Sequence, residues 1–436
     1  MATAATLPAE RTHEDRLQLG AFIGLLLFVV ALQVSIAAAN ILLALTLLVW
    51  LARRLRHDYG RLRATTAASA RASASLDEAR RAESGELRRS GEAAESGLII
   101  RQEPLEVPKM FIPLAAYGAI TLASAAFSTD PRASFVDSKQ LVLFWIVPMV
   151  YDVARGARAS TVLQWIISAG AICAALGIIQ YGVLEYDNLG RRPQGLLGHY
   201  MTYSGLIMLV ATAAAARLLY GRQERVWPAL MMPALLVALA LTFTRSAWVG
   251  ACASIAFLLL LKDFRLVAVL PVLAALFFAL APPRITDRFY SMFDSNDPTT
   301  IDRVTMLRVG ERMVAADPLT GVGPDMVGRE YAQYLSPSDE QHLNPHLHNV
   351  PLQVAAERGL PALAVWIWLI ATIVMDLVGR LRMPEGRMLA AAGLGAVVAM
   401  LTAGQFEYNF GDSEFLMLFL VLTTLPYAAT RAARAS

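Results

Sequence analysis

Residues 235–260 read LLVALALTFTRSAWVGACASIAFLLL, and Arg245 is the only charged residue among them. This stretch predicts the ends of two membrane-spanning helices, at 228–243 and 246–261, that meet in a sharp turn at Arg245. Its apolar residues are continuous and do not alternate with polar ones. That pattern favours helices over the strands of a membrane barrel.

Similar apolar blocks recur along the whole chain. Of its 436 residues, 56% are hydrophobic and 17% are charged, whereas soluble domains have roughly 45–50% and about 25%. This composition excludes an ordinary soluble protein. It predicts an all-α polytopic membrane protein with about twelve transmembrane helices. The predicted spans are 17–33, 35–52, 110–127, 139–154, 161–183, 199–217, 228–243, 246–261, 266–281, 360–379, 388–404 and 415–430.

Composition divides the chain into five parts. Residues 53–109 are rich in Ala, Arg, Glu and Ser and have few large apolar residues, which predicts a disordered or loosely helical loop. Residues 282–359 are too long for a simple connector, which predicts a partly helical, functional loop. The predicted parts are 1–52 with the first two helices, 53–109 as a cytoplasmic loop, 110–281 with helices three to nine, 282–359 as a periplasmic loop, and 360–436 with the last three helices.

Lysine and arginine gather in every second loop, which the positive-inside rule assigns to the cytoplasm. We therefore expect a multi-pass protein of the bacterial inner membrane with both termini in the cytoplasm. The intervening loops, and any site that they form, would face the periplasm. The loops predicted to be cytoplasmic contain Arg53, Arg155, Arg222, Lys262, Arg380 and Arg431.

Three arginines lie in short loops of the opposite face, where the positive-inside rule predicts few. Arg191 and Arg192 belong to GRRPQG, and Arg245 sits in the turn between two spans. An arginine near hydrocarbon is costly, and its guanidinium is suited to gripping phosphate oxygens through two hydrogen bonds. These residues are candidates for binding an anionic ligand. The alternative is that they reach the lipid headgroups.

The predicted periplasmic loop ends in a cluster of histidines. His342, His346 and His348 lie in SDEQHLNPHLHNV, residues 338–350. Such a cluster is compatible with a metal site, with general acid–base catalysis or with ordinary surface residues. Zinc usually takes three or four protein ligands, so we expect no metal here. His348, at the start of an apolar segment, is the preferred general base, and His346 is the alternative.

These segments resemble, in the same order, the O-antigen ligase and polymerase superfamily of polyprenyl-diphosphate-dependent membrane glycosyltransferases. The most specific pieces are DPLTGVGPD, at 317–325, and HLHNVPLQVAAERGL, at 346–360. The resemblance covers about residues 105–430. It implies a fold similar to the C-type glycosyltransferases, no cofactor and no metal. It also implies transfer of a glycan from undecaprenyl diphosphate to lipid A–core by a protein embedded in membrane lipids. We expect this transfer to be a direct displacement at the anomeric carbon, with inversion.

The resemblance assigns roles by position. His348 matches the family's essential histidine, Arg191 or Arg192 its first arginine, Arg245 its second and Arg303 the arginine of the loop. We expect these arginines, with Arg308 in support, to bind the diphosphate. Residues expected to orient the substrate or a histidine are Asn349, Glu407, Tyr408 and Asp412. Gly321 and Gly323 are expected to turn the backbone.

Several readings stay open at this point. A polymerase or a protein O-oligosaccharyltransferase of the same superfamily would use the same histidine and arginines with a different acceptor. A transporter of lipid-linked sugars would need the arginines but no base. The sequence indicates no nucleic-acid partner, and it fixes neither the glycan, the acceptor sugar nor the oligomeric state.

Overall fold

The computed structural model describes residues 8–56, 59, 106–221, 225–294, 296–384 and 386–431. These residues form helices joined by loops, with one isolated β-bridge and no strand among them, which confirms the all-α prediction. Nearly all of the predicted cytoplasmic loop 53–109 lies outside the described residues. The α-helices are α1 (Pro8–Ala31), Ile36–Arg56, α3 (Phe111–Ala126), α4 (Pro131–Asp137), α5 (Ile146–Val153), α6 (Ala157–Gly182), α7 (Tyr200–Tyr220), α8 (Val226–Leu241), α9 (Arg245–Lys262), α10 (Val269–Leu280), α11 (Pro283–Tyr290), α12 (Pro298–Ala316), α13 (Val327–Glu330), α14 (Val350–Leu381), α15 (Arg387–Ala403) and α16 (Ser413–Ala429). The 3₁₀ helices are η1 (Ser138–Trp145), η2 (Phe264–Ala268), η3 (Ser291–Phe293), η4 (Tyr331–Tyr334) and η5 (Asn409–Gly411).

Among the described residues, six helices are long and apolar enough to cross a membrane. They cover Ile36–Arg56, Pro131–Val153, Ala157–Gly182, Tyr200–Tyr220, Arg245–Lys262 and Val350–Leu381. Shorter apolar helices cover Arg16–Ala31, Phe111–Ala126, Val226–Leu241, Phe264–Leu280, Arg387–Ala403 and Ser413–Ala429. Each predicted span overlaps one of these helices. The chain is therefore a helical membrane protein, and the number of crossings stays a prediction.

The centre of the bundle is built around α15, which packs against α7, α9, α14 and α16. Small residues allow these helices to approach closely. A Cβ on Gly395 of α15 would lie 2.5 Å from Cγ2 of Thr212 on α7. A Cβ on Gly250 of α9 would lie 2.5 Å from Sδ of Met208 and 3.0 Å from the backbone oxygen of Ala399. Close packing here fixes the ends of α7, α9 and α15, which carry the site.

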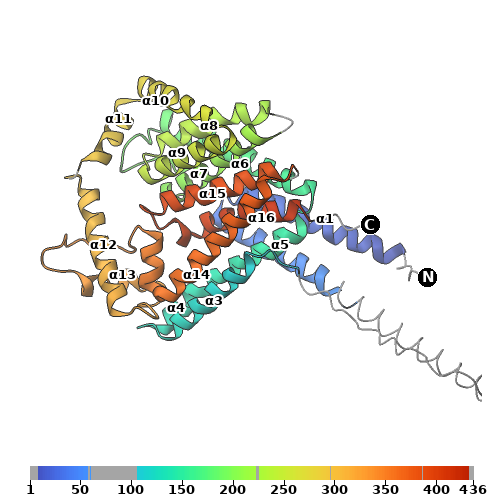
Figure 1. Cartoon of the computed structure of the whole chain (residues 1–436), viewed down its shortest axis with the longest axis horizontal. Helices are drawn as coiled ribbons and strands as arrows, with labels where there is room; N and C mark the ends of the chain where they lie inside the picture. Colours follow the sequence, from blue (N-terminus) through green and yellow to red (C-terminus); the bar gives the residue numbers. More distant parts are fainter. Residues whose placement is uncertain are drawn as a thin grey trace, which may run out of the picture.

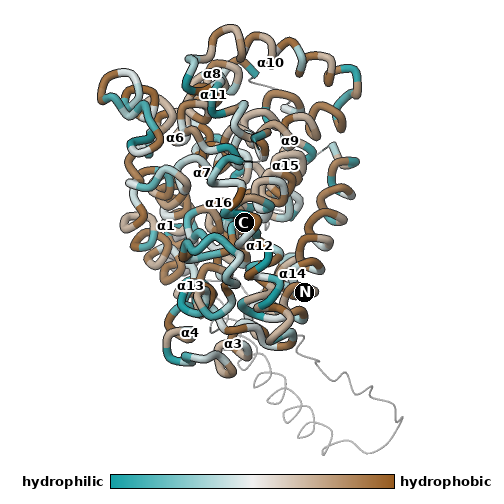
Figure 2. The backbone as a smooth tube through the Cα atoms, turned by 90° about the vertical axis from the view of Figure 1, so that its left-hand side faces the viewer, coloured by the Kyte–Doolittle hydropathy of each residue, from teal (hydrophilic) through white to brown (hydrophobic). Residues whose placement is uncertain are grey.

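Positive side chains meet at one end of the bundle. Arg53, Arg155 and Arg431 all pair with the buried carboxylate of Asp152. The predicted topology places these three arginines in loops of one face, and their shared partner agrees with that arrangement. In Figure 1, α1 begins on the side opposite α12 and α13. Figure 2 views the protein from the side of α12 and α13, and hydrophilic stretches around these two helices lie in front of hydrophobic helices.

Helix α14 begins at Val350, earlier than the predicted span 360–379. Asn349 caps its first turn by accepting a hydrogen bond from Leu352 N at 2.9 Å. The predicted boundary corresponds to a kink at Gly359, where φ is +79° and a Cβ would lie 2.2 Å from Leu319 O. The backbone of Gly359 is not helical, so two helical segments meet at this residue, and the predicted start of the span coincides with their junction. Glycine permits this φ, which other residues rarely adopt.

The segment around Gly321 and Gly323 docks against α14 at this kink. Both glycines have positive φ, +66° and +112°, which confirms their predicted role in turning the backbone. Val322 N and Gly323 N donate to the backbone oxygens of Ala356 and Glu357, each at 2.9 Å. A Cβ on Gly321 would lie 2.3 Å from the backbone of Glu357. The first part of α14 is thereby fastened to the long loop.

Candidate functional site

A cavity of about 240 Å³ opens where four separate segments meet. The segments are the start of α7, the turn between α8 and α9, the end of the long loop before α14, and the loop between α15 and α16. Its polar lining comes from side chains of all four segments. They include His199, Thr202, Thr244, His346, Glu407 and Asp412.

His348 and Glu407 form a hydrogen-bonded pair beside this cavity. Nδ1 of His348 lies 3.0 Å from Oε2 of Glu407. Burial would raise the pKa of Glu407, but the hydrogen bond and charge of His348, with His346 nearby, hold it below its usual range. The ionised carboxylate can only accept, so Nδ1 of His348 donates to it, and in a neutral imidazole the lone pair then lies on Nε2. With 19% of its side chain exposed, His348 can receive a proton from a bound substrate.

The backbone of His348 is unusual, with a φ of +49°. Non-glycine residues rarely adopt this left-handed conformation, and it persists only where the surroundings enforce it. The conformation turns the chain directly before the capping residue Asn349. A strained turn therefore places His348 directly before the N-terminus of α14.

His346 differs in character from its neighbour. Its ring lies 4.1 Å from that of His348, centroid to centroid, and it lines the cavity. Burial and then the charge of His348 lower the pKa of His346 to about 4. Its Nδ1 is buried and has no hydrogen-bond partner among the described residues. A ring with so low a pKa is a poor base, which favours His348 for that role.

The two histidines and Glu407 also form a set that could hold a metal ion. Each offers one ligand atom, and these atoms lie within 4.8 Å of one another. Two imidazoles and a carboxylate resemble the protein ligands of some catalytic zinc sites. The expectation of a metal-independent site therefore needs a direct test.

Arg245 is the first residue of α9 and is buried, with 7% of its surface exposed. Its Nη1 donates to the backbone oxygen of Ser291 at 3.0 Å and to Oγ of Ser291 at 3.2 Å. Its Nη2 lies 3.4 Å from Oδ1 of Asp297. These contacts join the turn between α8 and α9 to the long loop.

Three further arginines lie within electrostatic range of Arg245. Burial lowers the pKa of Arg192, and the charge of Arg245 lowers it further. Burial and the charges of Arg245, Arg192 and Arg303 lower the pKa of Arg288 to about 10. Burial lowers the pKa of Arg303, whereas Glu407 raises it. We call Arg192, Arg245, Arg288 and Arg303 the arginine cluster.

Arg303 connects the arginine cluster to the histidines. Its guanidinium lies 5.8 Å from the centre of the Phe406 ring, next to Glu407 in the chain. Its charge interacts with both Glu407 and Arg245. A histidine–carboxylate pair and a set of arginines therefore lie near one another, an arrangement that suits a ligand with both a hydroxyl and phosphates.

Residues 230–367 match a family model described as O-antigen ligase. The match contains Arg245, Arg303, His346 and His348, in the order that the sequence analysis noted. These residues are therefore similar to the O-antigen ligase family. This confirms the predicted superfamily, whose members are membrane glycosyltransferases that act on lipid-linked glycans. No curated protein matches the chain.

The matched segment does not contain the whole candidate site. Arg192 and Glu407 lie outside the matched residues and complete it from the loop before α7 and the loop between α15 and α16. Sequence reasoning ranked Glu407 only as a weak candidate, and it did not select Arg288 for the site. Arg288 is one of many arginines in the long loop, and nothing in its neighbours distinguishes it.

Other predicted residues have partners elsewhere. Arg191 is exposed, with its guanidinium 4.3 Å from the Tyr186 ring centre. Arg308 is 55% exposed and pairs with Asp339 at 3.6 Å. Neither perturbs the arginine cluster in any described interaction, so their roles in binding diphosphate stay predictions.

The predicted orienting residues have structural roles that can be stated. Asn349 caps α14. Asp412 caps α16 by accepting from Phe415 N at 2.9 Å, and it accepts from Oγ1 of Thr202 at 2.5 Å. The hydroxyl of Tyr408 accepts from Arg358 at 3.4 Å. Of these, Asp412 and Tyr408 also line the cavity, where contact with a sugar stays possible.

Proposed function

We propose that this protein transfers a glycan from undecaprenyl diphosphate to a sugar hydroxyl of lipid A–core at the periplasmic face of the inner membrane. The observation that supports this most is the His348–Glu407 pair, with its 3.0 Å contact, beside the arginine cluster. The pair supplies a base, and the cluster supplies cations. Both are needed to displace a diphosphate with a hydroxyl.

The donor's diphosphate binds to the arginine cluster. Two partly buried guanidiniums with lowered pKa, those of Arg288 and Arg303, gain a counter-charge when the diphosphate arrives, so binding offsets their mutual repulsion. Guanidinium groups also match phosphate oxygens in geometry. A single contact of this kind is worth about 2–4 kcal/mol in the transition state, or ~10²–10³ in rate.

Transfer then proceeds by direct displacement. Nε2 of His348 takes the proton of the acceptor hydroxyl, while Glu407 stabilises the positive charge on the ring. The acceptor oxygen forms a bond to the anomeric carbon from the face opposite the diphosphate. The bond from that carbon to the diphosphate oxygen breaks, and undecaprenyl diphosphate leaves with the electron pair. The product has an inverted anomeric centre.

The proposal is tested by transfer with purified protein, undecaprenyl-diphosphate-linked glycan and lipid A–core in vesicles. We expect His348→Ala to lose about 10²–10⁴ in rate and to keep binding the carrier. His342→Ala is the matched control, since His342 is 67% exposed and contacts Asp302 at 3.6 Å. An active His348→Ala variant would refute the proposed base.

The acceptor is tested in the same assay. Growth of carrier-linked chains without transfer to lipid A–core would identify a polymerase, and transfer to an added peptide would identify a protein O-oligosaccharyltransferase. Movement of carrier across the vesicle without transfer would indicate a transporter. Activity that survives a chelator would support the metal-independent reading, whereas activity that needs added zinc would assign the histidines and Glu407 to a metal.

A further inference from the structure

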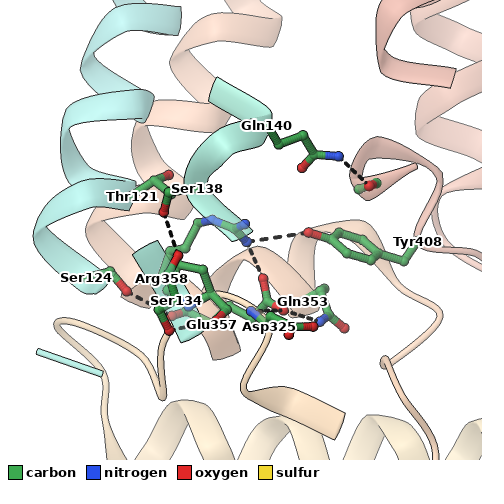
Figure 3. Close-up of polar contacts among 12 residues, drawn as sticks. Thr121, Ser124, Ser134, Ser138, Gln140, Asp325, Gln353, Glu357, Arg358 and Tyr408 are labelled. Carbon is green, nitrogen blue, oxygen red and sulfur yellow. Dashed lines mark hydrogen bonds and ion pairs between the residues drawn. The ribbon is translucent and has the colours of Figure 1, made fainter. Parts of the chain in front are cut away.

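Hydrogen bonds and covalent links form a closed circuit that passes through His348. Leu347 N donates to Oε1 of Gln353 at 2.7 Å, and Nε2 of Gln353 donates to Oε1 of Glu357 at 2.8 Å. Nη1 of Arg358 pairs with Oε2 of Glu357 and donates to the hydroxyl of Tyr408 at 3.4 Å. Figure 3 shows Arg358 between Tyr408 and Glu357, with Gln353 beside the carboxylate.

The path returns to His348 from the other side. Tyr408 N donates to Oε1 of Glu407 at 3.1 Å, and Oε2 of Glu407 holds Nδ1 of His348 at 3.0 Å. The peptide bond between Leu347 and His348 closes the circuit. The Leu347 N–H group and the carboxylate that contacts the His348 imidazole are thus two ends of one network, which we call the hydrogen-bond circuit.

The hydrogen-bond circuit contains an ion pair, between Glu357 and Arg358, that the stability of the fold alone does not require. Glu357 and Arg358 are buried, with 4% and 5% of their surface exposed. Taking both charges out of water costs free energy that their attraction only partly returns, and an apolar pair of similar volume would often be as stable. A buried pair of this kind is better explained by the geometry that it imposes.

That geometry is anchored to the rest of the fold. Asp325 N donates to Oε1 of Glu357 at 3.3 Å, and Oγ of Ser124 on α3 donates to the backbone oxygen of Glu357 at 3.0 Å. The hydrogen-bond circuit is therefore anchored to α3, to α14 and to the segment around Gly321 and Gly323. It can hold the left-handed backbone of His348, whose φ is +49°, against relaxation.

We propose that Gln353, Glu357 and Arg358 are positioning residues that orient His348 for proton removal, acting through the Leu347 amide and through Tyr408 and Glu407. The inference rests on the proposed function, because it takes His348 as the base. None of the three positioning residues needs to touch substrate. They fix the direction of Nε2 by fixing the backbone on one side and the carboxylate on the other.

Tyr408→Phe tests the proposal without a large change of volume. It removes the acceptor of Arg358 and keeps the aromatic ring. We expect kcat to fall about tenfold, the equivalent of one hydrogen bond, with the donor KM and the thermal midpoint nearly unchanged. Tyr331→Phe is the matched control. The hydroxyl of Tyr331 also accepts one hydrogen bond at 3.4 Å, from Asn344, but it lies outside the hydrogen-bond circuit.

Arg358→Lys and Arg358→Met test the ion pair. The lysine variant keeps the charge and should retain more kcat than the methionine variant, even where both are equally stable. The combined Arg358→Lys and Tyr408→Phe variant should lose less than the product of the single losses, because both break one path. Multiplicative losses, or loss of kcat only in step with loss of folded protein, would overturn the proposal.

The two proposals fail in distinguishable ways. If His348→Ala is inactive and Tyr408→Phe has parental kcat, the positioning role fails and the proposed function stands. If His348→Ala retains transfer, the proposed function fails, whatever the activities of the Tyr408 and Arg358 variants.

Discussion

Nη2 of Arg245 lies 3.4 Å from Oδ1 of Asp297, so the turn between two membrane helices is tied to the start of α12 in the long loop. Asp297 also caps α12 by accepting from Thr299 N at 2.9 Å. The arginine that interrupts this apolar stretch of the sequence is thus held by contacts within the protein. Ser291 and Asp297 of the long loop fix the orientation of its guanidinium.

Replacement of Arg245 should separate charge from geometry. Arg245→Lys keeps one positive charge and loses the two-pronged grip, and Arg245→Ala loses both. We expect losses of about tenfold for lysine and about 10²–10³ for alanine in kcat/KM for the donor. Arg284→Ala is the control, since Arg284 is 59% exposed and pairs with Asp187 in the same region. Equal activity of the Arg245 and Arg284 variants would exclude a role in the transition state.

The neighbouring arginines Arg191 and Arg192 should differ. Arg192 lies 4.3 Å from the Tyr200 ring centre and within range of Arg245, whereas exposed Arg191 lies against Tyr186. Arg192→Ala should raise the donor KM about tenfold or more, and Arg191→Ala should change it by less than about threefold. Titration of donor at fixed acceptor checks both. The reverse ranking would place the other arginine in the site.

Glu407→Gln should alter the pH dependence of transfer. The carboxylate, whose pKa is held low by His348, is ionised at neutral pH and stabilises a protonated imidazole. A neutral amide no longer does so, and kcat should fall about 10²-fold while the acid limb of the rate profile moves to lower pH. Gln405→Leu is the control on the same loop, where Nε2 of Gln405 only caps Leu401 O at 3.2 Å. An unmoved acid limb would separate Glu407 from the base.

His346 should make folding sensitive to acid. Its pKa in the folded protein is lowered to about 4, below the ordinary 6.5. The unfolded chain therefore takes up a proton that the folded chain refuses, and stability falls as pH drops from 6.5 towards 4. His346→Gln should lose less of its thermal midpoint over this range than the parent in the same detergent. His342→Gln controls for the loss of an imidazole, and a parental slope in His346→Gln would refute the assignment.

The spans and the key arginines could be predicted because their signals are local. A long block of apolar residues predicts a membrane helix whatever the rest of the chain does. A single charged residue inside such a block is easily recognised. The histidine motif, likewise, stands in one continuous segment. These features led to the superfamily that the family match then confirmed.

The rest depends on contacts between distant parts of the chain. Glu407 meets His348 across 59 positions, and no local pattern links them. Arg191 and Arg192 are adjacent in sequence but point to different tyrosines, so only the folded loop separates them. The predicted span begins at the kink in α14, but the contact of the Gly321 segment with that kink joins distant parts of the chain and could not be predicted.

The arginine cluster has a consequence for the end of the reaction. Before transfer the diphosphate is bonded to carbon at both ends, and afterwards one end is free and can ionise further. Burial and the neighbouring arginines lower the pKa of Arg288 to about 10, and these clustered cations should hold the more negative leaving carrier more tightly than the donor. Release of the spent lipid should then limit turnover, and added undecaprenyl diphosphate should inhibit competitively with the donor.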